Sequence, residues 1–211
     1  MIKHIHDPEN YITAGANLED ADRAVILVHG RGATAQSMLP LAAELKMNDV
    51  CFLIPQAAGN RWYPETAFGP LEANQPDLDS ALNNIAELIH LILKAGIPKK
   101  KVILGGFSQG ACLTGEFCAR NPAQYGGLFM LSGALIGPGE QIRTPVGRLS
   151  GTPVFLGCSD HDPWIPDGFV QRAADHFTEL VADVDLRIYP GLGHTINKDE
   201  IHAVREIISR A

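Results

Sequence analysis

The sequence predicts a doubly wound, mostly parallel α/β sheet with helices on both faces. Short apolar runs rich in β-branched residues alternate along the chain with segments of helical periodicity. The runs are almost continuously apolar, which is typical of strands covered on both faces, as in parallel sheets. A length of 211 residues without a linker-like change in composition predicts one domain over 1–211.

The first half of the chain alternates strand, helix and strand. Residues 24–28 form an apolar run that stops at a glycine-rich segment and predict a strand, and a helical stretch follows at about 37–45. Residues 50–54 predict the next strand. The loop 55–76 is rich in proline, glycine and aromatic residues and is too long for a simple connector, so we expect it to be functional. Apolar residues at helical spacing predict a long amphipathic helix over 77–95.

The second half repeats the alternation. The predicted elements are a strand at 101–105, a helix from Ser108 to Asn121, strands at 127–131 and 153–157, a helix at about 169–180, a strand at 184–189 and a helix at 198–209. The segment 137–151 is typical of an exposed loop. A cap domain could be inserted at such a loop, but this segment is only a short connection. We therefore predict minimal or no cap domain.

Charge and apolar pattern exclude several classes of protein. The formal net charge is −7 and the longest basic run is Lys99–Lys101, which gives no electrostatic footprint for nucleic acid. The N-terminus lacks the apolar core of a signal peptide, and no later run is long enough to span a membrane.

The cysteines point to a reducing compartment. No Cys-x-x-Cys pair occurs, and most of the cysteines stand in apolar segments, so we predict small buried hydrophobes with reduced thiols. The four are Cys51, Cys112, Cys118 and Cys158. Reduced thiols fit a cytoplasmic protein.

The segment Gly106-Phe107-Ser108-Gln109-Gly110 follows an apolar strand and precedes a helix. In this context Gly-x-Ser-x-Gly predicts a nucleophile elbow, a strained turn that exposes the serine hydroxyl and admits only small residues two positions away on either side. The turn also places Ser108 at a helix N-terminus, whose backbone donors favour negative charge. We predict Ser108 as nucleophile; the alternative is that the glycines merely allow close packing of strand and helix.

A serine nucleophile needs a base, which comes after it in the chain on folds with such an elbow. Of the downstream histidines, His176 and His202 fall in predicted helices, where we expect surface positions. His194 instead follows Gly191-Leu192-Gly193 in a loop between the last strand and the last helix, where catalytic groups gather in open α/β sheets. We predict His194 as base; the alternative is a histidine that caps the following helix.

The acid that orients the base should follow the preceding strand, where two aspartates stand. Asp160 is closer to the strand end and is typical of a turn-former through its own side chain. Asp162 lies further out, followed by Pro163, and we favour it as the acid. We expect His161, between the two, to be a bystander.

The chemistry also needs two backbone donors for the developing oxyanion. The N–H of Gln109 supplies one, and the glycine-rich loop His29-Gly30-Arg31-Gly32 after an earlier strand makes the Arg31 N–H the candidate for the other. We expect His29 to hold this loop by hydrogen bonding. No phosphate-binding Gly-Lys-Ser/Thr or Gly-x-Gly-x-x-Gly pattern follows.

Together these segments resemble the phospholipase/carboxylesterase family of α/β-hydrolases, which includes acyl-protein thioesterases. The likeness spans roughly residues 24 to 200. It is carried by Leu27-Val28-His29-Gly30-Arg31-Gly32, Gly106-Phe107-Ser108-Gln109-Gly110-Ala111, Asp160-His161-Asp162-Pro163-Trp164-Ile165-Pro166 and Gly191-Leu192-Gly193-His194. The resemblance implies the α/β-hydrolase fold, with the acid at Asp162 and the oxyanion donors at Arg31 and Gln109.

The resemblance also bears on the substrate. Residues 60–63 are similar to a family loop in which a tryptophan, here Trp62, borders the acyl pocket. Familiar members usually carry leucine where Arg31 stands, so a lipidated protein or long acyl chain is less strongly implied, and a bacterial-type branch of small carboxylesterases looks closer. The residues predicted to line the pocket are Trp62, Trp164, Met38, Phe68 and Arg61; any of the apolar ones is equally consistent with a place in the core.

Two roles remain open for the arginines near the predicted cleft. One hypothesis is that Arg31 or Arg61 selects an acyl or alcohol portion bearing a carboxylate, since a guanidinium suits bidentate recognition. The alternative is a surface arginine of which only the backbone is used.

The sequence predicts a serine hydrolase that cleaves carboxylic esters of small or medium acyl groups through an acyl-enzyme. Thioesterase or lysophospholipase activity is the alternative. A dienelactone-hydrolase-like enzyme is less favoured because that chemistry usually has cysteine at the elbow, and an inactive binding protein is disfavoured by the complete Ser-His-Asp set. We expect a small-molecule ester substrate, no metal or other cofactor and, from the prevalence of symmetric dimers, a homodimer.

Overall fold

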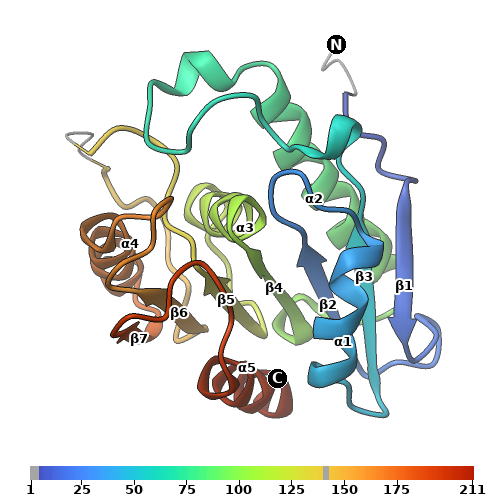
Figure 1. Ribbon diagram of the computed structural model, residues 1–211. Helices are drawn as coiled ribbons and strands as arrows, with labels where there is room; N and C mark the ends of the chain where they lie inside the picture. Colours follow the sequence, from blue (N-terminus) through green and yellow to red (C-terminus); the bar gives the residue numbers. More distant parts are fainter. Residues whose placement is uncertain (1–4, 140–142) are drawn as a thin grey trace.

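The computed structural model describes residues 5–139 and 143–211 and centres on a seven-stranded sheet (Figure 1). The strands lie in the order β1-β3-β2-β4-β5-β6-β7, and every neighbouring pair is parallel except β1 with β3. Their bounds are Tyr11–Gly15 (β1), Arg23–Val28 (β2), Val50–Pro55 (β3), Val102–Phe107 (β4), Gly127–Leu131 (β5), Pro153–Ser159 (β6) and Asp183–Tyr189 (β7). The mostly parallel sheet predicted from the sequence is confirmed.

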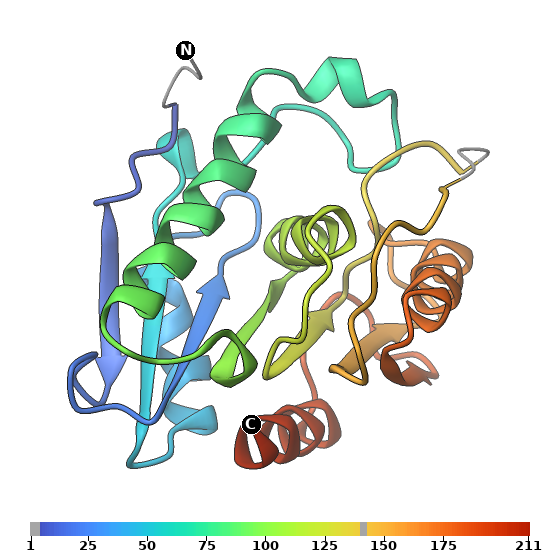
Figure 2. The ribbon, with the colours of Figure 1, turned by 180° about the vertical axis from the view of Figure 1, so that it is seen from behind.

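Helices cover both faces of this sheet (Figure 2). One face carries α2 (Asp77–Lys94), α3 (Gln109–Arg120) and α4 (Asp167–Glu179), and the other carries α1 (Leu39–Leu45) and α5 (Lys198–Arg210). Short 3-10 helices occur at Gln36–Met38, Ala58–Asn60, Leu71–Asn74 and Lys99–Lys101.

The continuous apolar runs are explained by the two cores. In β2, Ala24, Ile26 and Val28 pack toward α2 and α3, whereas Val25 and Leu27 pack toward α1 and α5. Because successive side chains of a strand point to opposite faces, a strand buried on both faces needs an apolar residue at every position. The four cysteines are free and buried, as predicted.

The edge strand β1 is not predicted from the sequence. This edge strand has five residues, runs antiparallel to β3 with Ile12 opposite Ile54, and has no fully buried residue. A short, half-buried edge strand carries neither a continuous apolar run nor enough length for a clear alternation.

The connection between β5 and β6 contains no further helix or strand among its described residues, although residues 140–142 of the loop predicted at 137–151 lie outside the described part of the chain. In the described ranges, no helix combines the length and the apolar character needed to cross a membrane.

The order of the strands fixes where a site can form. The strand that follows β2 in the chain, β3, lies on one side of it, and β4 lies on the other, so the winding direction reverses between β2 and β4. Open α/β sheets bind ligands at the carboxyl ends of the strands beside such a reversal. The loops after β2, β4, β6 and β7 all leave the sheet at this edge, and they carry the residues singled out above.

Candidate active site

Ser108 stands at the turn between β4 and α3. Its backbone has φ 55° and ψ −121°, a strained conformation for a residue other than glycine. A Cβ atom at Gly106 or Gly110 would lie 2.4 or 2.2 Å from the carbonyl oxygen of Val28, so only glycine fits at these positions. The glycines let α3 start directly against β2 and leave the serine hydroxyl at the strand edge.

His194 comes to Ser108 from the loop between β7 and α5. Its Nε2 lies 2.9 Å from the Ser108 Oγ. The ring also packs against Phe107, with 4.7 Å between ring centroids. Because Nε2 faces the Ser108 hydroxyl, the other ring nitrogen, Nδ1, is the one that can bind an orienting partner.

That partner is Asp162, whose Oδ2 lies 2.6 Å from Nδ1 of His194. The carboxylate is buried, and its other oxygen accepts hydrogen bonds from the N–H groups of Trp164 and Ile165. Burial works to raise the pKa of Asp162, but the hydrogen bonds from His194 and the two N–H groups outweigh it and hold the pKa below its ordinary value. The group therefore stays an anion beside the imidazole.

Asp160 has a different position. Its Oδ1 accepts a hydrogen bond from the N–H of Gly191 at 2.7 Å, and the neighbouring Ser159 Oγ accepts one from Gly193 at 3.0 Å. These two bonds fasten the loop that carries His194 to the end of β6. His161 is exposed, pairs with Asp160 and does not line the cavity beside Ser108.

The loop after β2 lies against Ser108, because a Cβ atom at Gly30 would be 3.3 Å from the Ser108 Cβ. Neither the N–H of Arg31 nor that of Gln109 donates a hydrogen bond to another residue in the described part of the chain. His29 holds the loop, because its Nδ1 bonds the Gly30 carbonyl and its Nε2 accepts the Ala57 N–H. Burial lowers the pKa of His29, which suits a neutral imidazole with this pair of partners.

A cavity of about 540 Å³ opens beside Ser108 and His194. Phe68 and Trp164, both predicted pocket residues, line it, and Trp164 is 70% exposed at its rim. The other lining residues are Gly30, Arg31, Ala33, Tyr63, Pro64, Glu65, Thr66, Ala67, Phe107, Gln109, Cys112 and Ile165. The long loop expected to be functional supplies six of the sixteen lining residues, Tyr63 to Phe68, more than any other segment. Cys112 and Ile165 also line the cavity and are not among the residues predicted from the sequence.

Three predicted pocket residues lie elsewhere. Trp62 is buried beneath the site, where its Nε1 donates to the His29 carbonyl, and the adjacent Tyr63 lines the cavity instead. Met38 packs in the core beside α1 and α5. Arg61 is exposed and outside the lining. Composition identified the loop, but not which of its successive side chains turn inward.

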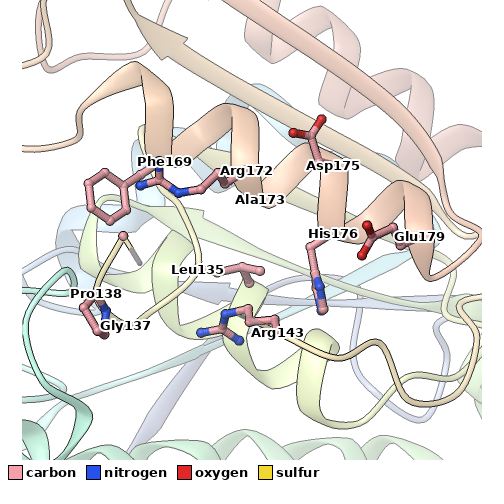
Figure 3. A pocket seen from close by; sticks show the side chains of 11 residues that line it. Leu135, Gly137, Pro138, Arg143, Phe169, Arg172, Ala173, Asp175, His176 and Glu179 are labelled. Carbon is pink, nitrogen blue, oxygen red and sulfur yellow. The ribbon is translucent and has the colours of Figure 1, made fainter. Parts of the chain in front are cut away.

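A second cavity of about 170 Å³ lies between α4 and the segment after β5 (Figure 3). His176 lines it and is buried, contrary to the expected surface position, because α4 turns this residue toward the body of the molecule. The ring of Phe169, which lines this cavity, lies 4.1 Å from the ring of Phe68, which lines the larger one. The two rings meet between the cavities.

No cluster of three or more histidine, cysteine, aspartate or glutamate side chains suited to a metal ion occurs within the described ranges.

The fold, with a serine on a strand-to-helix turn and a histidine and an aspartate on later loops, defines an α/β-hydrolase. The phospholipase/carboxylesterase family model matches residues 11–211, and the chain belongs to this family.

Known proteins agree with this assignment. The chain is 38% identical to a phospholipase/carboxylesterase from Dyadobacter fermentans of known crystal structure, with a TM-score of 0.92 over 99% of this chain and 100% of that one. It is 26% identical to acyl-protein thioesterase 1 of Saccharomyces cerevisiae over 96% of this chain and 98% of the relative. Esterase PE8 shares the fold, with a TM-score of 0.79 at 24% identity over 95% of this chain and 97% of that one. The chain is a hydrolase enzyme.

Proposed function

We propose that this hydrolase cleaves carboxylic esters of small or medium acyl groups, with Ser108 as nucleophile, His194 as base and Asp162 as its orienting acid. The observation that carries the proposal is the continuous line of contacts from Asp162 through His194 to Ser108, 2.6 and 2.9 Å long, at the edge of the 540 Å³ cavity. A nucleophile, a base within hydrogen-bond reach and a group that orients the base are the parts that acyl transfer through serine requires.

In the first step, Nε2 of His194 takes the proton of the Ser108 hydroxyl while the oxygen attacks the ester carbonyl. Asp162 accepts the Nδ1–H of the ring, keeps the tautomer in which Nε2 is free to accept, and stabilises the imidazolium that forms. The N–H groups of Arg31 and Gln109, which have no acceptor among the described residues, serve as donors to the tetrahedral oxyanion. His194 then gives its proton to the leaving alcohol, and the acyl group stays on Ser108.

In the second step, water replaces the alcohol. His194 removes a proton from the water, the hydroxide attacks the acyl-enzyme, and Ser108 recovers its proton as the carboxylic acid leaves. The acyl portion is held by the apolar walls of the cavity, among them Phe68, Ala67 and Ile165.

Thioester cleavage is the second candidate, because curated relatives with similarity over almost the whole chain are named acyl-protein thioesterase 1. The same acyl-enzyme serves both reactions, and only the leaving group differs. Serine at the elbow, rather than cysteine, disfavours dienelactone-hydrolase-like chemistry.

Hydrolysis of p-nitrophenyl esters of graded chain length, measured beside matched thioesters, tests the proposal together with labelling by a fluorophosphonate. We expect ester turnover and labelling in the wild type, and loss of both in Ser108→Ala by a factor of about 10³ or more. Ser209→Ala is the matched control, because Ser209 is an exposed serine on α5. This variant should retain both ester turnover and labelling. Full turnover in Ser108→Ala would contradict the proposal.

A further inference from the structure

The side chain of Arg31 donates hydrogen bonds to backbone carbonyls of the protein itself. Its Nη1 donates to the carbonyl of Pro64 at 2.7 Å, and its Nη2 donates to the carbonyls of Tyr63, at 3.0 Å, and Glu65. The guanidinium also lies over the Tyr63 ring, 6.0 Å from its centroid. One arginine thus holds three successive carbonyls of the segment that walls the candidate active-site cavity.

The Gln109 side chain also binds this segment. Its Nε2 donates to the Tyr63 carbonyl at 2.9 Å, and its Oε1 accepts the N–H of Trp62 at 2.8 Å. The Tyr63 carbonyl oxygen therefore accepts from both Arg31 and Gln109, the two residues whose backbone N–H groups we assign to the oxyanion. A carbonyl oxygen has two lone pairs, and here both are used.

This arrangement joins two parts of the site. The backbone N–H groups of Arg31 and Gln109 form the proposed oxyanion hole. Their side chains make hydrogen bonds to residues 62–65, which we call the wall segment. The hydrogen bond from the Gly32 N–H to the Asn60 carbonyl, 2.7 Å long, also joins the loop after β2 to the loop that contains the wall segment. A displacement of the wall segment would therefore shift the donors, and oxyanion stabilisation depends on donors held within a fraction of an ångström.

The same contacts bear on the substrate. Arg31 is the only lysine or arginine among the described residues that line the cavity. A guanidinium has five N–H donors, and it binds a carboxylate through paired donors on Nη1 and Nη2 or on Nε and Nη2. Both N–H groups of Arg31 Nη2 donate to carbonyls of the wall segment, so neither pair is complete, and the Nε–H and the second Nη1–H remain only as single donors. The cavity therefore offers no bidentate cation site for an acidic acyl group.

The geometry points to Arg31 as a positioning residue that, with Gln109, fixes the oxyanion hole to the wall segment, in a site that takes neutral rather than carboxylate-bearing acyl groups. This inference deepens the proposed esterase function and rests on it. It opposes the hypothesis that Arg31 selects acidic substrates, and it gives the side chain a role that leucine at this position could not fill.

The test compares Arg31→Leu and Arg31→Lys with the wild type on two esters of similar size, p-nitrophenyl butyrate and p-nitrophenyl hemisuccinate. If Arg31 positions the donors, Arg31→Leu lowers kcat about 10- to 100-fold for both esters, with their kcat/KM ratio unchanged. Arg31→Lys should be impaired nearly as much, because a single ammonium cannot span three carbonyls. Arg205→Leu is the matched control, since Arg205 is an exposed arginine that donates to one carbonyl, that of Glu44, on α1.

Hydrogen–deuterium exchange over residues 57–68 gives a readout that needs no turnover. We expect faster exchange of the Trp62 and Glu65 amides in Arg31→Leu, and no change in Arg205→Leu. Selective loss of hemisuccinate turnover, with Arg31→Lys retaining it, would overturn the inference in favour of a carboxylate anchor. Unchanged kinetics or unchanged exchange would overturn it in favour of a solvated surface arginine. A failure of the esterase proposal shows separately, as absent ester turnover in the wild type or full turnover in Ser108→Ala.

Discussion

Oδ2 of Asp162 lies 2.6 Å from Nδ1 of His194, while the other oxygen of the carboxylate accepts two backbone N–H groups. In Asp162→Asn, the amide oxygen takes the Oδ1 position, where it still accepts the two backbone N–H groups. The NH₂ group then takes the Oδ2 position and faces the imidazole. His194 must then accept at Nδ1 and carry its proton on Nε2, where it cannot take the Ser108 proton. We expect kcat for a p-nitrophenyl ester to fall by about 10⁴ while the fold is retained.

Asp160→Asn is the matched control for that change, since Asp160 stands two residues away at the end of the same strand. The asparagine oxygen can still accept the Gly191 N–H, so the loop with His194 stays fastened. We expect less than a tenfold loss of kcat in this variant. Equal losses in the two variants would mean that Asp162 acts only by holding the loop.

How far the sequence predicts this site depends on whether a role is fixed by chain order or by side-chain direction. Ser108 and His194 follow β4 and β7 on loops at one sheet edge, and parallel strands bring such loops together. The choice of Asp162 over Asp160 rested on local turn chemistry, which agrees with the contacts found. These inferences needed no knowledge of the packing.

Other features depend on tertiary contacts that no local pattern encodes. Within the loop after β3, Trp62 turns into the core and Tyr63 faces the cavity, although both are large aromatics in irregular backbone. The Arg31 side chain finds its acceptors 32 to 34 residues away along the chain. Periodicity gives inward and outward faces only in helices and strands, so loop residues need coordinates.

The packing of α3 against β2 leads to a prediction about stability. A Cβ atom at Gly110 would lie 2.2 Å from the Val28 carbonyl oxygen and 2.6 Å from that of His29. Backbone atoms cannot rotate away, so Gly110→Ala must push the helix off the strand, and we expect the free energy of unfolding in urea to fall by about 1–3 kcal/mol or more.

Gly168→Ala is the control for this change, because Gly168 lies in the first turn of α4 and its Cβ would meet only the end of the Arg172 side chain, at 3.9 Å. Here alanine should leave the free energy of unfolding unchanged or raise it by up to about 1 kcal/mol, the difference in helix propensity. A Gly110→Ala protein as stable as Gly168→Ala would contradict the close approach of α3 and β2.

Glu200 at the start of α5 gives a pH dependence of stability. Its carboxyl is buried; Oε2 accepts the Asn197 N–H, whereas Oε1 has no hydrogen-bond partner among the described residues. Burial raises the pKa of Glu200 to about 7, opposed by the Asn197 hydrogen bond and reinforced by nearby Asp199. The folded state therefore holds this proton more tightly than the unfolded chain does.

The sign of the effect follows. The contribution of the protonated group to stability is complete below the ordinary glutamate pKa of about 4.5 and is lost as the pH rises through about 7. In Glu200→Gln, which keeps an acceptor for Asn197 and does not titrate, the stability relative to wild type should increase between pH 5 and pH 8.5 in urea unfolding. Glu44→Gln, the same substitution at an exposed position on α1, is the matched control. A pH-independent difference between Glu200→Gln and the wild type would mean that the Glu200 carboxyl is ionised in the folded protein throughout.

The contact between Phe68 and Phe169 predicts the limit on acyl length. Their ring centroids lie 4.1 Å apart, Phe68 lines the 540 Å³ cavity beside Ser108 and Phe169 lines the 170 Å³ cavity along α4, so the two rings stand between the cavities. The exposed Arg172 lies over the Phe169 ring. Phe169→Ala should open the partition and let two further methylenes of a longer chain leave water, at about 0.8 kcal/mol each. We therefore expect the kcat/KM ratio of p-nitrophenyl octanoate to butyrate to rise about tenfold. Phe169→Leu, which keeps most of the volume, should change that ratio little, and an unchanged ratio in Phe169→Ala would place the acyl chain elsewhere in the larger cavity.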